Sequence, residues 1–275
     1  MIRNVDRISW VCVCKYLISL FALGKSSLQF HNRERERERE IPLNMRRKQE
    51  LRVLCLHGFR TSGRIMKMQM RDVMKTCPFV DFVFVDGPHE AKGEAHEIVR
   101  RIWNPKEYKY YEWWDRDEET KEYVGVERSI KYLSSVFEER GPFDGILGFS
   151  QGGAFAATLC AMRNDLSWLS SVRFGLLFSA FLPRDETLSR AFENMKKHNK
   201  KDDFKIWMTC GEKEEEFFHR AIDKENKDSF PNIFGKKSSV SVTHPTGHEF
   251  PLLCRDGRDT LSSLKLFLGG IQSVD

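Results

Sequence analysis

The chain has 275 residues, of which 40% are hydrophobic, and this length suits one α/β domain with a substantial core. Its net charge of +5 is small, and the basic residues are interleaved with acidic ones, so the composition predicts no nucleic-acid partner. Seven cysteines without a Cys-x-x-Cys pair argue against a disulfide framework or a zinc site and favour a reducing compartment. A cytoplasmic protein is therefore expected, with a nuclear location also open.

Residues 1–44 differ from the rest of the chain. The apolar run Ile8–Leu23 is short and interrupted by Lys15, so stable membrane insertion is not expected. Four Arg-Glu dipeptides follow over Arg33–Glu40 and cannot supply a core. An alternating A/G dinucleotide tract translates as Arg-Glu in any reading frame, so we interpret residues 1–44 as a translated leader, with organellar targeting as the alternative. Either way, a non-core extension is expected before one domain over residues 45–275.

From Met45 onward, segments typical of strands alternate with segments typical of helices. Apolar runs predict strands over Leu51–Leu56, Asp81–Val85, Phe143–Leu147, Phe174–Phe181 and Lys205–Cys210, and alternation predicts a last strand over Ser238–Thr243. Helices are expected over residues 66–77, 126–137, 154–159, 187–198 and 261–268. The alternation predicts an α/β fold with a mostly parallel central sheet and helices on both faces.

The connection over residues 89–123 is long and rich in aromatic residues. Long connections at the carboxyl ends of parallel strands often build substrate pockets, so this segment is a candidate wall of an acyl site. The alternative is that rings such as Trp113, Trp114 and Tyr123 simply pack the connection onto the domain.

Ser150 lies in Gly148-Phe149-Ser150-Gln151-Gly152, between an apolar run and a stretch of small residues. The two glycines let strand and helix approach closely while the serine takes a strained backbone conformation. This pattern is typical of the nucleophile elbow of α/β-hydrolases and predicts Ser150 as the nucleophile. The Gln151 N–H, without an intrahelical acceptor, is expected to stabilise a negative oxygen.

A second donor of the predicted oxyanion hole is expected after the first strand, which ends at His57-Gly58. In α/β-hydrolases this loop carries a backbone N–H that faces the nucleophile, and Phe59 is the candidate here. An ordinary loop with Ser62 as helix N-cap is compatible with the same residues.

A serine hydroxyl needs an imidazole to take its proton and an acid to orient that imidazole. In this fold the chain order is serine, acid, histidine, and Ser150, Glu214 and His248 satisfy it, each just beyond a predicted strand. His57 is expected to be structural, and His244, which precedes a proline, is the weaker candidate base.

Several motifs occur together in this chain. They are Leu54–Gly63, Asp86-Gly87-Pro88, Tyr111–Trp114, Gly141–Gly152 and His244–His248 with Pro251. In this order they resemble the FSH-type serine hydrolases, which include fungal esterases and thioesterases and proteins similar to the ovarian-cancer-associated gene 2 product. The resemblance covers roughly residues 51–253. It implies an α/β-hydrolase that acts on a small-molecule acyl ester or thioester without a metal or cofactor, with Ser150 as nucleophile and His248 as base.

The chain departs from that family at the acid. Where the family has Gly-x-x-Asp, this sequence has Gly211-Glu212-Lys213-Glu214, and the extra methylene moves the carboxylate outward unless the loop compensates. The alternative acids are Glu212, Glu215, Glu216 and Asp185. It also stays open whether His248 is oriented without an acid.

The sequence therefore predicts a serine carboxylesterase or thioesterase that works through an acyl-enzyme. The alternative is a hydrolase-fold ligand-binding or signalling protein with weak or lost catalysis. The oligomeric state is left open.

Overall fold

The computed structural model describes residues 50–273 except 118, 121, 199–203 and 254–256. The expectations for residues 1–44, and for a start at Met45, concern a part of the chain outside these residues and stay predictions. Within the described ranges, no helix is long and apolar enough to cross a membrane.

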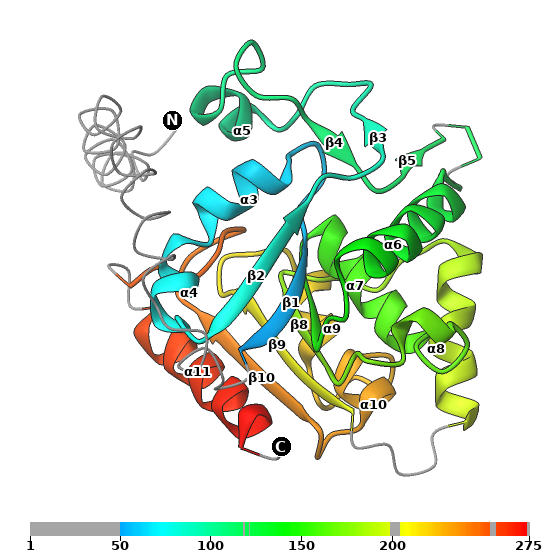
Figure 1. The fold of residues 1–275 in the computed structure, drawn as a ribbon, viewed down its shortest axis with the longest axis vertical. Helices are drawn as coiled ribbons and strands as arrows, with labels where there is room; N and C mark the ends of the chain where they lie inside the picture. Colours follow the sequence, from blue (N-terminus) through cyan, green and yellow to red (C-terminus); the bar gives the residue numbers. More distant parts are fainter. Residues whose placement is uncertain (1–49, 118, 121, 199–203, 254–256, 274–275) are drawn as a thin grey trace, which may run out of the picture. The chain divides into compact units, whose positions relative to one another are not determined.

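Six parallel strands form the central sheet, in the order β10-β9-β8-β7-β1-β2 (Figure 1). Their bounds are β1 Leu51–Leu56, β2 Val80–Val85, β7 Gly145–Phe149, β8 Phe174–Phe178, β9 Lys205–Gly211 and β10 Ser239–His244. Every predicted strand segment contributes a strand. The central strands β7 and β8 are buried along their whole length, because a sheet covered on both faces buries side chains of both alternating sets. The predicted α/β class with a mostly parallel sheet is confirmed.

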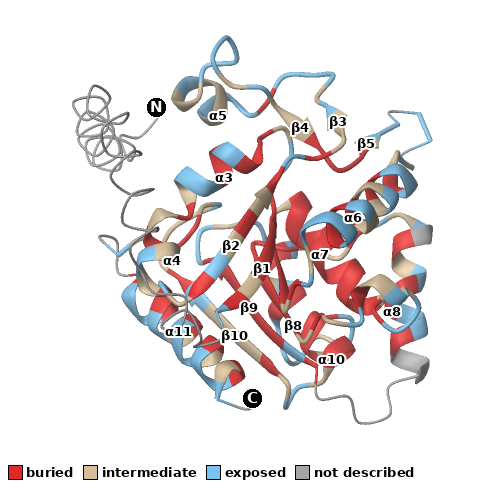
Figure 2. Ribbon diagram, viewed as in Figure 1, coloured by how far each residue is buried: buried red, intermediate tan, exposed pale blue. Residues whose placement is uncertain are grey.

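Helices cover both faces of this sheet. One face packs against α3 Gly63–Gln69, α4 Arg71–Thr76 and α11 Arg258–Gln272. The other packs against α6 Val126–Arg140, α7 Gln151–Ala161, α8 Glu186–His198, α9 Glu216–Ile222 and α10 Phe230–Phe234. Strand β1 shows the division, since Val53 and Cys55 join the first layer whereas Leu54 and Leu56 join the second. Every residue of α7 is buried, and Figure 2 shows this helix and the sheet as the centre of the core.

The connection between β2 and α6 contains short elements that the sequence did not predict. They are α5 Glu97–Ile102, the antiparallel pair β3 His89–Glu90 and β4 Tyr111–Glu112, and the pair β5 Asp115–Arg116 and β6 Tyr123–Val124. Trp113 and Trp114 are buried in the core, so for these two rings the packing interpretation is confirmed. Tyr123 stacks on Trp114 with ring centroids 5.0 Å apart and is only half-buried.

Several predicted elements have different bounds in the structure, and for two of them the backbone gives the reason. The helix expected over residues 66–77 is divided into α3 and α4 at Met70, whose backbone (φ −83°, ψ 9°) leaves the helical region. The strand expected to reach Phe181 ends at Phe178, because Ser179 adopts a positive φ of 47° that a strand cannot accommodate.

Candidate active site

Ser150 occupies a sharp turn between β7 and α7. Its backbone has φ 55° and ψ −117°, a conformation that costs about 1–3 kcal/mol and persists only when its surroundings enforce it. The turn is fixed by a hydrogen bond from the Ser150 N–H to the Phe178 carbonyl at 3.0 Å. A Cβ at Gly148 would lie 2.0 Å from the Gly152 carbonyl oxygen, so only glycine permits this approach of strand and helix. The strained elbow predicted from the sequence is therefore present.

The imidazole of His248 lies between Ser150 and Glu214. Its Nε2 is 2.9 Å from the Ser150 Oγ, and its Nδ1 is 3.1 Å from Oε2 of Glu214. The ring centroids of Phe149 and Phe218 lie 4.9 and 4.8 Å from that of the imidazole, which restricts its rotation. The side chain is 41% exposed, so the ring stays open to a substrate.

The Glu214 side chain is fully buried, in contrast to the imidazole that it contacts. Its Oε1 accepts a hydrogen bond from the Ser179 hydroxyl at 2.6 Å and another from the Gly211 N–H at 2.7 Å. A buried carboxylate is costly unless its oxygens are hydrogen-bonded, and these donors supply that compensation. The side chain bends back onto the turn that begins at Gly211. The loop therefore compensates for the extra methylene of glutamate, which was expected from the sequence to move the carboxylate outward.

Gly211 allows the loop that carries Glu214 to contact the loop that carries His248. A Cβ at Gly211 would lie 2.3 Å from the Thr246 carbonyl oxygen and 2.4 Å from that of Gly247. The Lys213 N–H also donates to the Thr246 carbonyl at 3.1 Å. This close approach brings the carboxylate within hydrogen-bonding distance of the imidazole.

Asp185 and Glu216, two of the alternative acids, have other partners. Asp185 accepts hydrogen bonds from the backbone N–H groups of Tyr123 and Leu188, at 3.3 and 3.1 Å, and so caps α8. Glu216 pairs with Arg220 at 3.7 Å on the surface of α9. Of the acidic side chains in the described part of the chain, Glu214 alone contacts the His248 imidazole.

The other two histidines considered from the sequence are buried. Nδ1 of His244 forms a 2.8 Å hydrogen bond with the Thr246 hydroxyl, and burial lowers the pKa of this imidazole. The His57 ring donates from Nδ1 to the Gly58 carbonyl at 2.8 Å and accepts at Nε2 from the Gly87 N–H at 2.9 Å. Burial lowers the pKa of His57 from 6.5 to about 4, so the ring is neutral near pH 7. This agrees with the structural role expected for it.

The expected oxyanion donors are the N–H groups of Phe59 and Gln151. Neither has an acceptor within the described ranges of the chain. The Gly58 carbonyl belongs to the same peptide unit as the Phe59 N–H and accepts from both Thr61 Oγ1 and His57 Nδ1, each at 2.8 Å. Because a peptide unit is planar and trans, these two bonds fix the direction of the Phe59 N–H.

The sequence did not predict the roles of two side chains in the site. The Gln151 side chain accepts from the Trp113 N–H at 3.0 Å and donates to the Trp114 carbonyl at 2.8 Å, so it attaches the aromatic connection to the elbow. The Ser179 hydroxyl donates a hydrogen bond to Glu214. The sequence indicated this role only by placing Ser179 in the strand predicted over residues 174–181, at the same edge of the sheet as the elbow. The structure thus brings Ser150, His248 and Glu214 together, while their catalytic roles stay predictions.

The described part of the chain contains no cluster of three or more histidine, cysteine or acidic residues that could hold a metal ion. Cys160 and Cys210 are buried free thiols, and burial raises the pKa of each to about 12, so neither forms a thiolate readily near neutral pH.

Comparison with known proteins gives three findings. Residues 45–256 match the family model described as serine hydrolase (FSH1). The esterase CG5412 of Drosophila melanogaster is 29% identical over 217 residues, which are 74% of this chain and 69% of that protein. The rhodanese-like domain-containing protein 6 of Arabidopsis thaliana is 35% identical over 164 residues, 51% of this chain but 27% of that protein. The chain therefore spans only part of these curated relatives.

Among solved structures, the acyl-protein thioesterase 2 of Zea mays superposes with a TM-score of 0.51. The alignment covers 80% of this chain and 94% of that chain at 16% sequence identity. At this identity the likeness supports the α/β-hydrolase fold alone.

Proposed function

Because the chain belongs to the serine hydrolase (FSH1) family, we propose that it hydrolyses a carboxylic ester or thioester through an acyl-enzyme on Ser150. The observation that carries this proposal is the continuous chain of contacts from Ser150 Oγ to His248 Nε2 at 2.9 Å and from His248 Nδ1 to Glu214 Oε2 at 3.1 Å. These distances suit proton transfer from the serine and stabilisation of the imidazolium that results.

In the acylation step, His248 Nε2 takes the hydroxyl proton as Ser150 Oγ attacks the substrate carbonyl carbon. The negative charge that develops on the carbonyl oxygen is stabilised by the N–H groups of Phe59 and Gln151. The imidazolium then protonates the leaving alcohol or thiol as its bond to carbon breaks.

In the deacylation step, the neutral imidazole takes a proton from water while the water oxygen attacks the acyl carbon. Collapse of this second intermediate returns the proton to Ser150 and releases the carboxylic acid. Glu214 holds Nδ1 of the ring as the protonated nitrogen throughout, because its Oε2 accepts a hydrogen bond from that atom. Nε2 thus stays free to accept the serine proton.

We assign this activity to a domain over residues 45–275 and propose a cytoplasmic location. Cys55, Cys77, Cys160 and Cys210 are free thiols in the described core, which accords with a reducing compartment.

The test compares wild type with Ser150→Ala on 4-nitrophenyl butyrate and on butyryl-N-acetylcysteamine, a matched ester and thioester. Loss of the nucleophile should reduce kcat by at least about 10³-fold on both substrates. Ser171→Ala, which removes a hydroxyl bound to the Phe143 carbonyl, is the control and should keep wild-type kcat. Equal turnover by wild type and Ser150→Ala would contradict the proposal. Absent turnover in wild type would favour a ligand-binding protein.

A further inference from the structure

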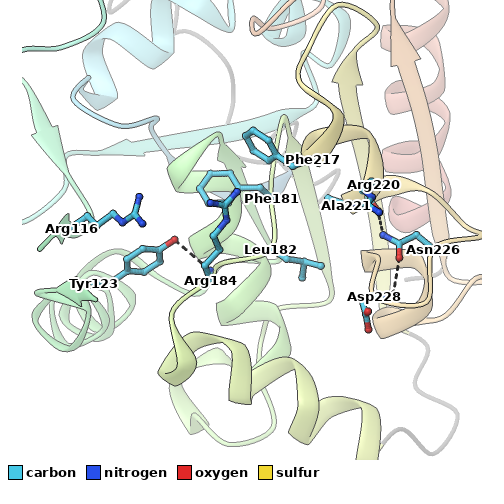
Figure 3. Close-up of a pocket in the computed structure, with 10 residues that line it drawn as sticks. All are labelled: Arg116, Tyr123, Phe181, Leu182, Arg184, Phe217, Arg220, Ala221, Asn226 and Asp228. Carbon is cyan, nitrogen blue, oxygen red and sulfur yellow. Dashed lines mark hydrogen bonds between the residues drawn. The ribbon is translucent and has the colours of Figure 1, made fainter. Parts of the chain in front are cut away.

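A cavity of about 390 Å³ lies between the β5–β6 pair, the segment that follows β8, and helix α9 (Figure 3). Its apolar lining includes Phe181, Leu182 and Phe217. A cavity of this size accommodates part of a small ligand. Ser150, His248 and Glu214 do not line this cavity, so the proposed chemistry assigns no ligand to it.

Aromatic rings connect this cavity to the candidate active site. The Phe181 ring meets those of Phe217 and Phe218 edge-on, with centroids 5.9 and 6.1 Å away. The Phe218 centroid lies 4.8 Å from that of the His248 imidazole. Phe218 therefore connects the rings that line the cavity with the imidazole of the candidate active site.

The charge around the cavity is predominantly positive. Its lining includes Arg116, Arg184 and Arg220, opposed by the single acidic residue Asp228. Arg220 has a partner, since its guanidinium lies 3.7 Å from Glu216. The positive charge of this cavity therefore depends on the other two arginines.

Arg116 and Arg184 are exposed, and neither guanidinium has an ion pair or hydrogen bond within the described residues. The carboxylate of Asp185, next in the chain to Arg184, is occupied by the N–H groups of Tyr123 and Leu188. The Arg184 N–H donates to the Tyr123 hydroxyl at 3.5 Å, which links the two walls that carry these arginines (Figure 3). Two guanidinium groups are thus available to a ligand beside an apolar surface.

We propose that this cavity binds a carboxylate or phosphate group of the substrate, held by Arg116 and Arg184, with an apolar segment along Phe181 and Phe217. Guanidinium groups bind both anions through paired, charge-assisted hydrogen bonds. The inference rests on the proposed hydrolysis at Ser150 and narrows its substrate class to esters or thioesters with an anionic group remote from the scissile bond. That group belongs either to the acyl chain or to the leaving group.

Two matched pairs of substrates distinguish these sources. The first compares the 4-nitrophenyl ester of octanoic acid with the mono-4-nitrophenyl ester of suberic acid, which adds a terminal carboxylate to the acyl chain. The second compares octanoyl-N-acetylcysteamine with octanoyl-coenzyme A, which adds phosphates to the leaving group. If wild type prefers the anionic member of the first pair, the anionic group belongs to the acyl chain. If it prefers the anionic member of the second pair, the anionic group belongs to the leaving thiol.

The measurement is kcat/KM of wild type, Arg116→Gln, Arg184→Gln and the double variant. Wild type should prefer the anionic member of at least one pair by about 10-fold, and the double variant should lose that preference while it keeps wild-type turnover of the neutral member. Arg128→Gln, an exposed arginine on α6 that does not line the cavity, is the charge control and should leave the preference intact.

Preference for the neutral member of both pairs, or a preference for the anion that survives in the double variant, would overturn the inference and leave the proposed hydrolysis standing. Absence of Ser150-dependent turnover of all four substrates would overturn the proposed function and the inference with it.

Discussion

The Ser179 hydroxyl donates a 2.6 Å hydrogen bond to Oε1 of Glu214, the carboxylate whose other oxygen lies 3.1 Å from Nδ1 of His248. Ser179 holds a positive φ of 47° directly after β8, so a strained residue that follows one strand orients the acid that follows the next strand. The N–H of Gly211 donates to the same Oε1 at 2.7 Å. The glutamate is thereby fixed on two sides, and its longer side chain does not leave the carboxylate mobile.

Removing the Ser179 hydroxyl should weaken this orientation without touching the substrate. Ser179→Ala is expected to lower kcat by about 10-fold, the usual effect of losing one hydrogen bond to a charged group, with KM unchanged. Steady-state kinetics on 4-nitrophenyl butyrate provide the measurement, with Ser171→Ala as the control. A kcat equal to that of wild type would show that Glu214 does not depend on Ser179.

Replacing Glu214 by glutamine tests the acid itself. The amide cannot stabilise the imidazolium and places an N–H donor in competition with Nδ1, so kcat should fall by about 10³-fold while folding is retained. Asp185→Asn is the matched control and should keep near wild-type kcat, because Asp185 caps α8. Near wild-type turnover by Glu214→Gln together with an inactive Asp185→Asn would reverse the assignment.

His57 should make the stability of the fold depend on pH. Burial lowers its pKa from 6.5 to about 4, so between these values the unfolded chain binds a proton that the folded protein does not. The contribution of the neutral imidazole to the free energy of unfolding is fully present above pH 6.5. As the pH falls toward 4, about 3 kcal/mol of that free energy is lost.

Urea unfolding of wild type and His57→Gln at several pH values between 4 and 7 isolates this contribution, since glutamine does not titrate. The two stability curves should converge as the pH falls. Parallel curves over this range would show that His57 protonates equally in the folded and unfolded states.

A side chain at Gly211 should separate the loops that carry Glu214 and His248. Gly211→Ala is expected to destabilise the fold by about 1–3 kcal/mol, through overpacking against the Thr246 and Gly247 carbonyls, and to lower kcat. Gly269→Ala in α11 is the control, because a Cβ at this position meets nothing within 4 Å. This substitution should stabilise the helix by about 0.5–1 kcal/mol. Wild-type stability and kcat in Gly211→Ala would contradict the close approach.

The sequence was sufficient to predict the six strands, because five contain short apolar runs that end near polar residues and β10 alternates valine with polar residues. It also predicted the elbow at Ser150, since the glycine spacing reflects a local steric requirement. It favoured Glu214 over Asp185 only through the spacing from Gly211 and left Asp185 as an alternative, because both follow a strand and the geometric difference lies in the backbone turn at Gly211. The short elements over residues 89–124 depend on tertiary contacts such as those of the Gln151 side chain, which have no periodic signature.

Covalent labelling with a fluorophosphonate tests the role of Ser150 most directly, because the reagent reacts with activated serines and needs no knowledge of the natural substrate. Intact-mass spectrometry of wild type should show one adduct per chain, peptide mapping should locate it on Ser150, and Ser150→Ala should remain unlabelled. Stoichiometric labelling of Ser150→Ala, or an adduct located on another residue of the wild type, would contradict Ser150 as the nucleophile.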